Sequence, residues 1–94
     1  MEEIAVDAHS LRPDRLQAVQ EWVRSFGVEP NDVRPLFTIR RGEREWELHL
    51  SRFRRGEGGR MIIDHARNDV VTDLMIVHIG ARESWPSFEG GVIE

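Results

Sequence analysis

The segment RFRRGEGGR, residues 52–60, has the residue types that come nearest to a recognisable chemistry. It places four arginines around three glycines in a chain whose formal net charge is −4. Consecutive glycines let a backbone turn its N–H groups toward an anion, and arginines add charge-assisted hydrogen bonds to a phosphate. A nucleotide-binding P-loop also needs Gly-Lys-[Ser/Thr] ahead of a helix, which this segment lacks. We therefore interpret residues 54–59 as a hairpin loop.

The same segment belongs to a longer basic stretch, residues 40–60. Residues 34–60 hold eight arginines and four glutamates, whereas the sequence on either side is net acidic. Arginines at this density, with Trp46 or Phe53 for stacking, are typical of surfaces that bind nucleic acid or nucleotide phosphates. The candidate anion contacts are Arg41, Arg44, Arg54, Arg55 and Arg60. The overall negative charge argues against a dedicated nucleic-acid domain, so this function is our alternative hypothesis.

Composition explains part of the arginine content. Arginine supplies all 13 basic residues, and both lysine and tyrosine are missing. Because the codons of these two residues are A/T-rich, the bias indicates a GC-rich genome rather than selection for phosphate contacts. The chain also has no cysteine, which excludes disulfides and thiolate metal sites.

Histidines and acids form no motif with catalytic or metal-binding spacing. None of His49, His65 and His78 has a partner at the i, i+4 spacing of a helical ligand pair, and only strand pairing could bring His49 near Asp64. The serines lie in no nucleophile elbow, and the acids are scattered. We predict no catalytic residues, no metal and no cofactor, and therefore a protein that is not an enzyme.

Residues 10–27 carry the signals of an amphipathic helix. Ser10 is the expected N-cap, and Pro13 falls in the first turn, where its missing N–H costs little. Gly27 is expected to end the helix in the left-handed conformation. The apolar stripe consists of Leu16, Val19, Val23 and Phe26, with Trp22 at its edge.

The segment LFTIRRGEREWELHL, residues 36–50, predicts a β-hairpin. A two-residue turn at Gly42-Glu43 would place Ile39 opposite Trp46 and Arg40 opposite Glu45. One face of the hairpin would then be apolar and the other would carry paired charges.

Further extended patterns occur at residues 3–8, 60–65 and 73–81, where a strand is favoured over a short helix. The order β-α-β-β-β-β predicts an α+β fold, with one amphipathic helix on one face of a mostly antiparallel sheet. We expect the other face to be polar. Residues 1–82 should form a single domain, and residues 83–94 a partly ordered C-terminal tail.

The helix and the loop after it carry a recurring set of residues. The set comprises Ala18-Val19, Trp22, Gly27-Val28 and Pro30-Asn31-Asp32-Val33. In this set the chain resembles a group of small proteins from actinobacteria and their bacteriophages, over about residues 15–65. The shared residues are structural and carry no catalytic motif, so the resemblance implies no activity.

Aromatic residues outside the expected core point to a protein interface. Trp22, Trp85 and Phe88 are the candidates, since aromatic residues and arginine are enriched at binding hot spots. Core packing is the favoured interpretation of Trp22, and docking of Trp85 against its own domain is as consistent with the sequence as contact with a partner. No apolar run reaches the length of a membrane span, and the acidic N-terminus lacks a secretory signal, which favours the cytoplasm. Our leading hypothesis is a non-enzymatic binding module that acts through a protein partner or through itself. Small chains with long edge strands often pair edge to edge, which favours a homodimer.

Overall fold

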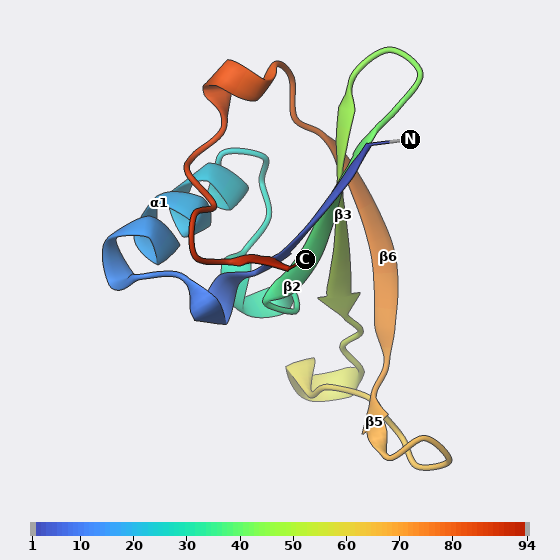
Figure 1. Ribbon diagram of the computed structural model, residues 1–94. Helices are drawn as coiled ribbons and strands as arrows, with labels where there is room; N and C mark the ends of the chain where they lie inside the picture. Colours follow the sequence, from blue (N-terminus) through green and yellow to red (C-terminus); the bar gives the residue numbers. More distant parts are fainter. Residues whose placement is uncertain (1, 94) are drawn as a thin grey trace.

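One helix lies on one face of a five-stranded antiparallel sheet in the computed structural model, which describes residues 2–93 (Figure 1). The strand order is β6-β3-β2-β1-β7. The main elements are β1 (Glu3–Asp7), α1 (Pro13–Arg24), β2 (Leu36–Arg41), β3 (Trp46–Phe53), β6 (Thr72–His78) and β7 (Val92–Ile93). The predicted α+β class is confirmed.

Helix α1 begins later than the capping signal predicted. Its N-cap is Arg12, which makes no side-chain capping bond, while Ser10 instead bonds to the carboxylate of Asp7. The prediction for Ser10 was wrong because residues 8–10 form a separate 3-10 turn, η1 (Ala8–Ser10), which Asp7 caps. The C-terminal prediction is confirmed, since Gly27 has a φ of 80° and its N–H bonds to the carbonyl of Arg24 at 2.9 Å.

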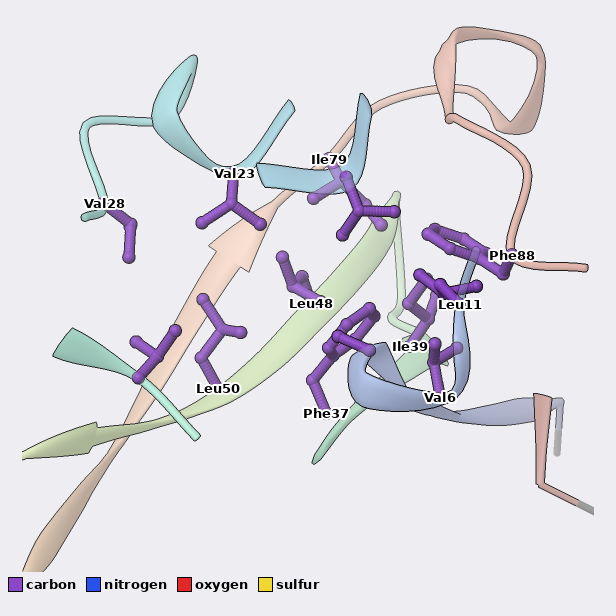
Figure 2. Packing of buried hydrophobic residues seen from close by; sticks show 13 residues of the cluster. Val6, Leu11, Val23, Val28, Phe37, Ile39, Leu48, Leu50, Ile79 and Phe88 are labelled. Atoms are coloured by element: carbon purple, nitrogen blue, oxygen red, sulfur yellow. The ribbon is translucent and has the colours of Figure 1, made fainter. Parts of the chain in front are cut away.

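The hydrophobic core lies between α1 and the sheet. Alternate residues of the central strands point toward the helix, because side chains in a strand alternate between its two faces. Ile39 and Leu48 are fully buried, and Val23 of α1 lies over the same side of the sheet (Figure 2). Val19, also from α1, belongs to the same buried cluster. The other buried members are Val6, Ala8, Leu11, Val28, Val33, Phe37, Leu50, Ile79 and Phe88.

The hairpin between β2 and β3 has a different register from the predicted one. Ile39 lies opposite Leu48, and Arg40 lies opposite Glu47. The N–H of Gly42 bonds to the carbonyl of Glu45 at 2.9 Å, so the tip lies one residue further along the chain. The predicted partners were therefore wrong by two residues. A shift of two keeps every side chain on its predicted face, which is why the hydrophobic pattern could not distinguish the two registers.

Gly42→Ala tests this register, because a Cβ at position 42 would lie 2.6 Å from the carbonyl oxygen of Glu45. We expect a loss of about 1–3 kcal/mol in the free energy of unfolding, as for other overpacked sites, measured by urea denaturation. Gly56→Ala is the control, since its nearest neighbour would be a flexible Ile62 carbon at 3.5 Å. Equal stability of the two variants would contradict the observed register.

The far end of the β3-β6 hairpin extends into a small ribbon. Of the predicted strand at residues 60–65, only β4 (Ile63–Asp64) is a strand, and it pairs with β5 (Asp69–Val70) outside the main sheet. Its tip is tight because the Asp64 carboxylate accepts the N–H of Ala66 at 3.0 Å. The place beside β3 is taken by β6, so the favoured strand at residues 73–81 is confirmed over Thr72–His78.

The C-terminal segment adds a strand that the sequence pattern did not predict. Strand β7 pairs antiparallel with β1, with Val92 opposite Val6 and Ile93 opposite Ala5. The segment before it contains a 3-10 turn, η4 (Arg82–Ser84), and the buried Phe88. Residues 82–93 therefore run across the helix-covered side and end at the sheet edge opposite β6.

Candidate interaction surface

The arginines of the basic stretch do not form one patch. Arg41 is the last residue of β2 and Arg44 lies in the turn before β3, whereas Arg54, Arg55 and Arg60 follow the end of β3. A strand of eight residues is about 25 Å long, so the two groups lie at opposite ends of the sheet, as the hairpin tip and the turn after β3 show in Figure 1. A nucleic acid would have to follow β3 over its whole length to contact both groups.

Three of the five candidate anion contacts already have partners within the chain. Arg54 makes a two-pronged ion pair with Asp73, with Nε 3.1 Å from Oδ2. Arg55 reaches the carboxylate of Asp32 at 3.1 Å. The guanidinium of Arg41 lies 5.5 Å from the ring centre of Trp46. The two remaining candidates, Arg44 and Arg60, are exposed.

The ion pair with Arg54 lowers the pKa of Asp73. The hydrogen bonds from Arg54, and then its positive charge, hold the pKa of the Asp73 carboxyl below its ordinary value. At the neighbouring ribbon, hydrogen bonds from Arg34 and from the backbone N–H of Val70 lower the pKa of the Asp69 carboxyl. Both acids therefore remain negatively charged under all but strongly acidic conditions.

Arg54→Gln should raise the pKa of Asp73 toward its ordinary value of 3.8, measured by NMR titration of the side-chain carboxyl. A carboxyl with a lowered pKa in the folded state stabilises the fold above its unfolded pKa and loses this contribution as the pH falls through the folded value. Asp69 serves as the internal control, because its partner Arg34 is unchanged. An unaltered Asp73 titration would show that the ion pair does not form in solution.

The three aromatic interface candidates pack within the domain. The ring of Trp22 lies 5.4 Å from Phe26 and 5.6 Å from Phe88, which is itself buried against Phe37. The indole N–H of Trp85 donates to the carbonyl of Ile79 at 3.2 Å, so much of the polarity of this side chain is satisfied internally. These residues attach the C-terminal segment to the helix and the sheet.

The histidines do not converge on one site. His49 Nε2 lies 3.2 Å from the Glu47 carboxylate, and His78 Nδ1 lies 3.6 Å from the Glu45 carboxylate. Asp64 lies in the distant ribbon, where its carboxylate caps the tip. Within residues 2–93, no group of three side chains has the arrangement of metal ligands.

An apolar hollow of about 330 Å³ lies between α1 and the ends of β2 and β3. Leu16, Phe37 and Phe53 contribute to its wall, and Arg34 lies at its rim. Arg34 is paired with Asp69 at 3.0 Å and lies over the Phe53 ring, so its charge is already compensated. Among the described residues that line the hollow, the one side chain charged at neutral pH is therefore already paired.

The sheet face opposite α1 is open and carries more apolar surface than predicted. Cross-strand pairing places Ile76, His49, Thr38, Ala5 and Ile93 in one row across all the strands. A second row at the hairpin end is charged and runs through His78, Glu47, Arg40 and Glu3. The expectation of a polar face was wrong in part, because exposed apolar side chains interrupt it. They are Leu36, Leu74, Ile76 and Ile93.

Two of these four side chains lie on β6, at the edge of the sheet. Leu74 is 68% exposed and Ile76 is 47% exposed. The pattern TDLMIVH has apolar residues on both faces, which in a sequence is also typical of a fully buried strand. Because polar and apolar residues do not alternate in this segment, the sequence did not indicate that one face of β6 is open. Leu74 and Ile76 were therefore not predicted as site residues.

In the part of the chain that the structure describes, no strand pairs with the outer edge of β6. Ile79 donates to Trp46, and Arg54 donates to Val71. Because bonded and non-bonded pairs alternate in an antiparallel ladder, these two bonds assign residues 73, 75 and 77 to the bonds with β3. The backbone N–H and C=O groups of Thr72, Leu74, Ile76 and His78 point outward. Natural edges are usually protected by several charges, prolines or bulges, but β6 has one carboxylate, Asp73, and no proline.

Comparisons with protein-family models, with curated proteins and with solved structures find no match for this chain. The resemblance to actinobacterial and phage proteins stays a prediction. Among residues 2–93, no helix is long and apolar enough to cross a membrane.

Proposed function

We propose that this protein is a small non-enzymatic binding module that takes up a protein partner at β6. The observation that supports this proposal is the open edge of β6, a seven-residue strand that carries the exposed side chains of Leu74 and Ile76. An extended partner segment would add a strand to the sheet there. In such complexes the backbone hydrogen bonds supply affinity, and pockets for alternate side chains supply specificity.

The chemistry of the edge defines the partner segment. Side chains of a strand added beside β6 would meet Leu74 and Ile76 on the open face, so we expect apolar residues at alternate positions. On the helix-covered side they would meet Met75 and Val77, which are half-buried. A partner with apolar residues on both faces therefore fits better than a charged peptide or an anion.

Peptide selection on the immobilised full-length chain tests strand addition. We expect enrichment of extended peptides that bind wild type and bind Leu74→Pro at least about tenfold more weakly. Proline at position 74 removes an N–H that points away from β3, and edge strands tolerate such a proline. Peptides that bind both proteins equally, or no enrichment at all, would contradict the proposal.

A matched pair of lysine variants separates the edge from the rest of the open face. Ile76→Lys and Leu36→Lys both place a charge among exposed apolar residues, but Leu36 lies on the interior strand β2. We expect Ile76→Lys to abolish peptide binding and Leu36→Lys to preserve it. Hydrogen exchange of β3 amides confirms that each variant remains folded.

Binding of nucleic acid through residues 40–60 is the alternative, and fluorescence anisotropy with single-stranded and duplex DNA and RNA tests it. Because the arginines form two separate groups and three have internal partners, we expect no binding tighter than the non-specific range of about 1–100 µM. A tighter complex with a steep salt dependence, lost in Arg54→Ala/Arg55→Ala, would favour the alternative.

A further inference from the structure

We propose that the partner at β6 is a second copy of this chain. The two β6 strands would pair antiparallel about a two-fold axis at Met75, and the two five-stranded sheets would join into one continuous sheet. This inference rests on the proposed function, because it requires that β6 is the docking edge. The pairing would be isologous, so one edge supplies both halves of the interface.

The positions of the outward backbone groups select this axis. With the axis at Met75, Leu74 lies opposite Ile76 of the second copy, and Thr72 lies opposite its His78. All four outward residues are then hydrogen-bonded, and the overlap covers the whole of Thr72–His78. An axis at Leu74 or Ile76 would reduce the overlap within β6 from seven residues to five. The central pairing therefore satisfies the largest number of edge groups.

In this register the side chains of β6 are also compatible with those of a second β6. Leu74 and Ile76 of both copies would form one apolar cluster on the open face. The dimer would thereby cover the two side chains of β6 that are exposed large hydrophobics in the single chain. Asp73 would lie opposite Val77 of the second copy, so no two like charges are directly opposed. Asp73 is in addition compensated by Arg54 within its own chain. The edge therefore lacks the repulsion that normally prevents strands of this kind from pairing with themselves.

The charges near the two ends of β3 neither drive nor oppose this pairing. Residues 40–47 at the hairpin end hold three arginines and three glutamates, so that end has no net charge. At the other end, Arg54 and Arg55 are paired with Asp73 and Asp32. The two β3 strands would be about 14 Å apart, beyond a Debye length of about 8 Å, so charges on them contribute little to the dimer.

Single-cysteine cross-linking of the full-length chain tests the register, since the natural sequence has no cysteine. The axis places the two Met75 Cα atoms about 4.5 Å apart, within disulfide range, so Met75→Cys should cross-link to itself. Leu74→Cys should cross-link poorly alone, because its symmetry mate is offset by two residues. A mixture of Leu74→Cys and Ile76→Cys should cross-link readily. Leu36→Cys is the exposed control that should remain monomeric.

Sedimentation equilibrium over a concentration series measures the association itself. We expect a dimer that dissociates on dilution, with Leu74→Pro and Ile76→Lys monomeric at every concentration. Ile76→Lys keeps the test decisive if the proline variant does not fold. A wild-type dimer that survives both substitutions, or that cross-links through Leu36→Cys, would overturn the inference.

Peptide binding separates this inference from the proposed function. A monomeric wild type that still selects strand-like peptides sensitive to Leu74→Pro would overturn self-pairing and leave the binding module standing. A monomeric wild type that selects no such peptides would overturn both.

Discussion

Phe88→Ala is expected to lower the free energy of unfolding by about 3–5 kcal/mol, the usual cost of removing a buried phenylalanine ring. Phe88 is 9% exposed, and its ring lies 5.6 Å from Trp22 and 5.9 Å from Phe37. The substitution removes contacts with the helix and the sheet together and leaves a cavity between them. Urea denaturation followed by tryptophan fluorescence measures the loss.

Val92→Ala is the matched control for this prediction. Val92 lies in the same segment but is about half exposed, so its truncation should change stability by no more than about 0.5 kcal/mol. A loss below about 1 kcal/mol for Phe88→Ala would contradict the packing of this segment in the core. The expected contrast would mean that Phe88, rather than the pairing of β7, supplies most of the stability with which the C-terminal segment is attached to the domain.

The elements with a strong local period were predictable. The apolar stripe of α1 and the alternation in β2 and β3 gave the α+β fold, and Gly27 marked the end of the helix. The hairpin register was not recoverable in the same way, because the period of a strand is two residues and a slip of two leaves both faces intact. The close contact between Gly42 and the Glu45 carbonyl distinguishes the registers, and it appears only in three dimensions.

The C-terminal segment could not be placed from its sequence. Trp85 and Phe88 occur among turn residues with no period, and their partners Trp46, Trp22 and Phe37 lie far away along the chain. Strand β7 has two residues, which is too short to give an alternating pattern. Contacts between distant segments decide such a region, and the sequence alone does not order them.

The candidate surfaces could not be predicted from the sequence either, because they depend on contacts between distant segments. Arginines that are close in sequence lie at opposite ends of β3, because a strand separates its two turns by its own length. The open edge of β6 depends on which strand is last in the sheet, and the apolar pattern of TDLMIVH suits an interior strand equally well. The surface that we propose at β6 is therefore set by strand order rather than by local composition.

Leu48→Ala and Leu74→Ala form a matched pair with opposite expected effects. Leu48 is 0% exposed on the interior strand β3, and Leu74 is 68% exposed on the edge strand β6. At low protein concentration, we expect Leu48→Ala to lose about 2–5 kcal/mol of unfolding free energy and Leu74→Ala to lose no more than about 0.5 kcal/mol. Urea denaturation measures both variants under the same conditions.

In the dimerisation measurement we expect the larger effect from Leu74→Ala and the smaller effect from Leu48→Ala. Leu74→Ala removes apolar surface from the proposed β6 interface and should shift the monomer-dimer equilibrium toward the monomer. Leu48→Ala should leave that equilibrium unchanged wherever the chain is still folded, because Leu48 lies on the helix-covered face. Loss of stability in Leu74→Ala would mean that β6 is already covered within the monomer. Unchanged association in that variant would place any dimer contact elsewhere, so this single pair of substitutions separates the residues that hold the domain together from those that would hold two copies together.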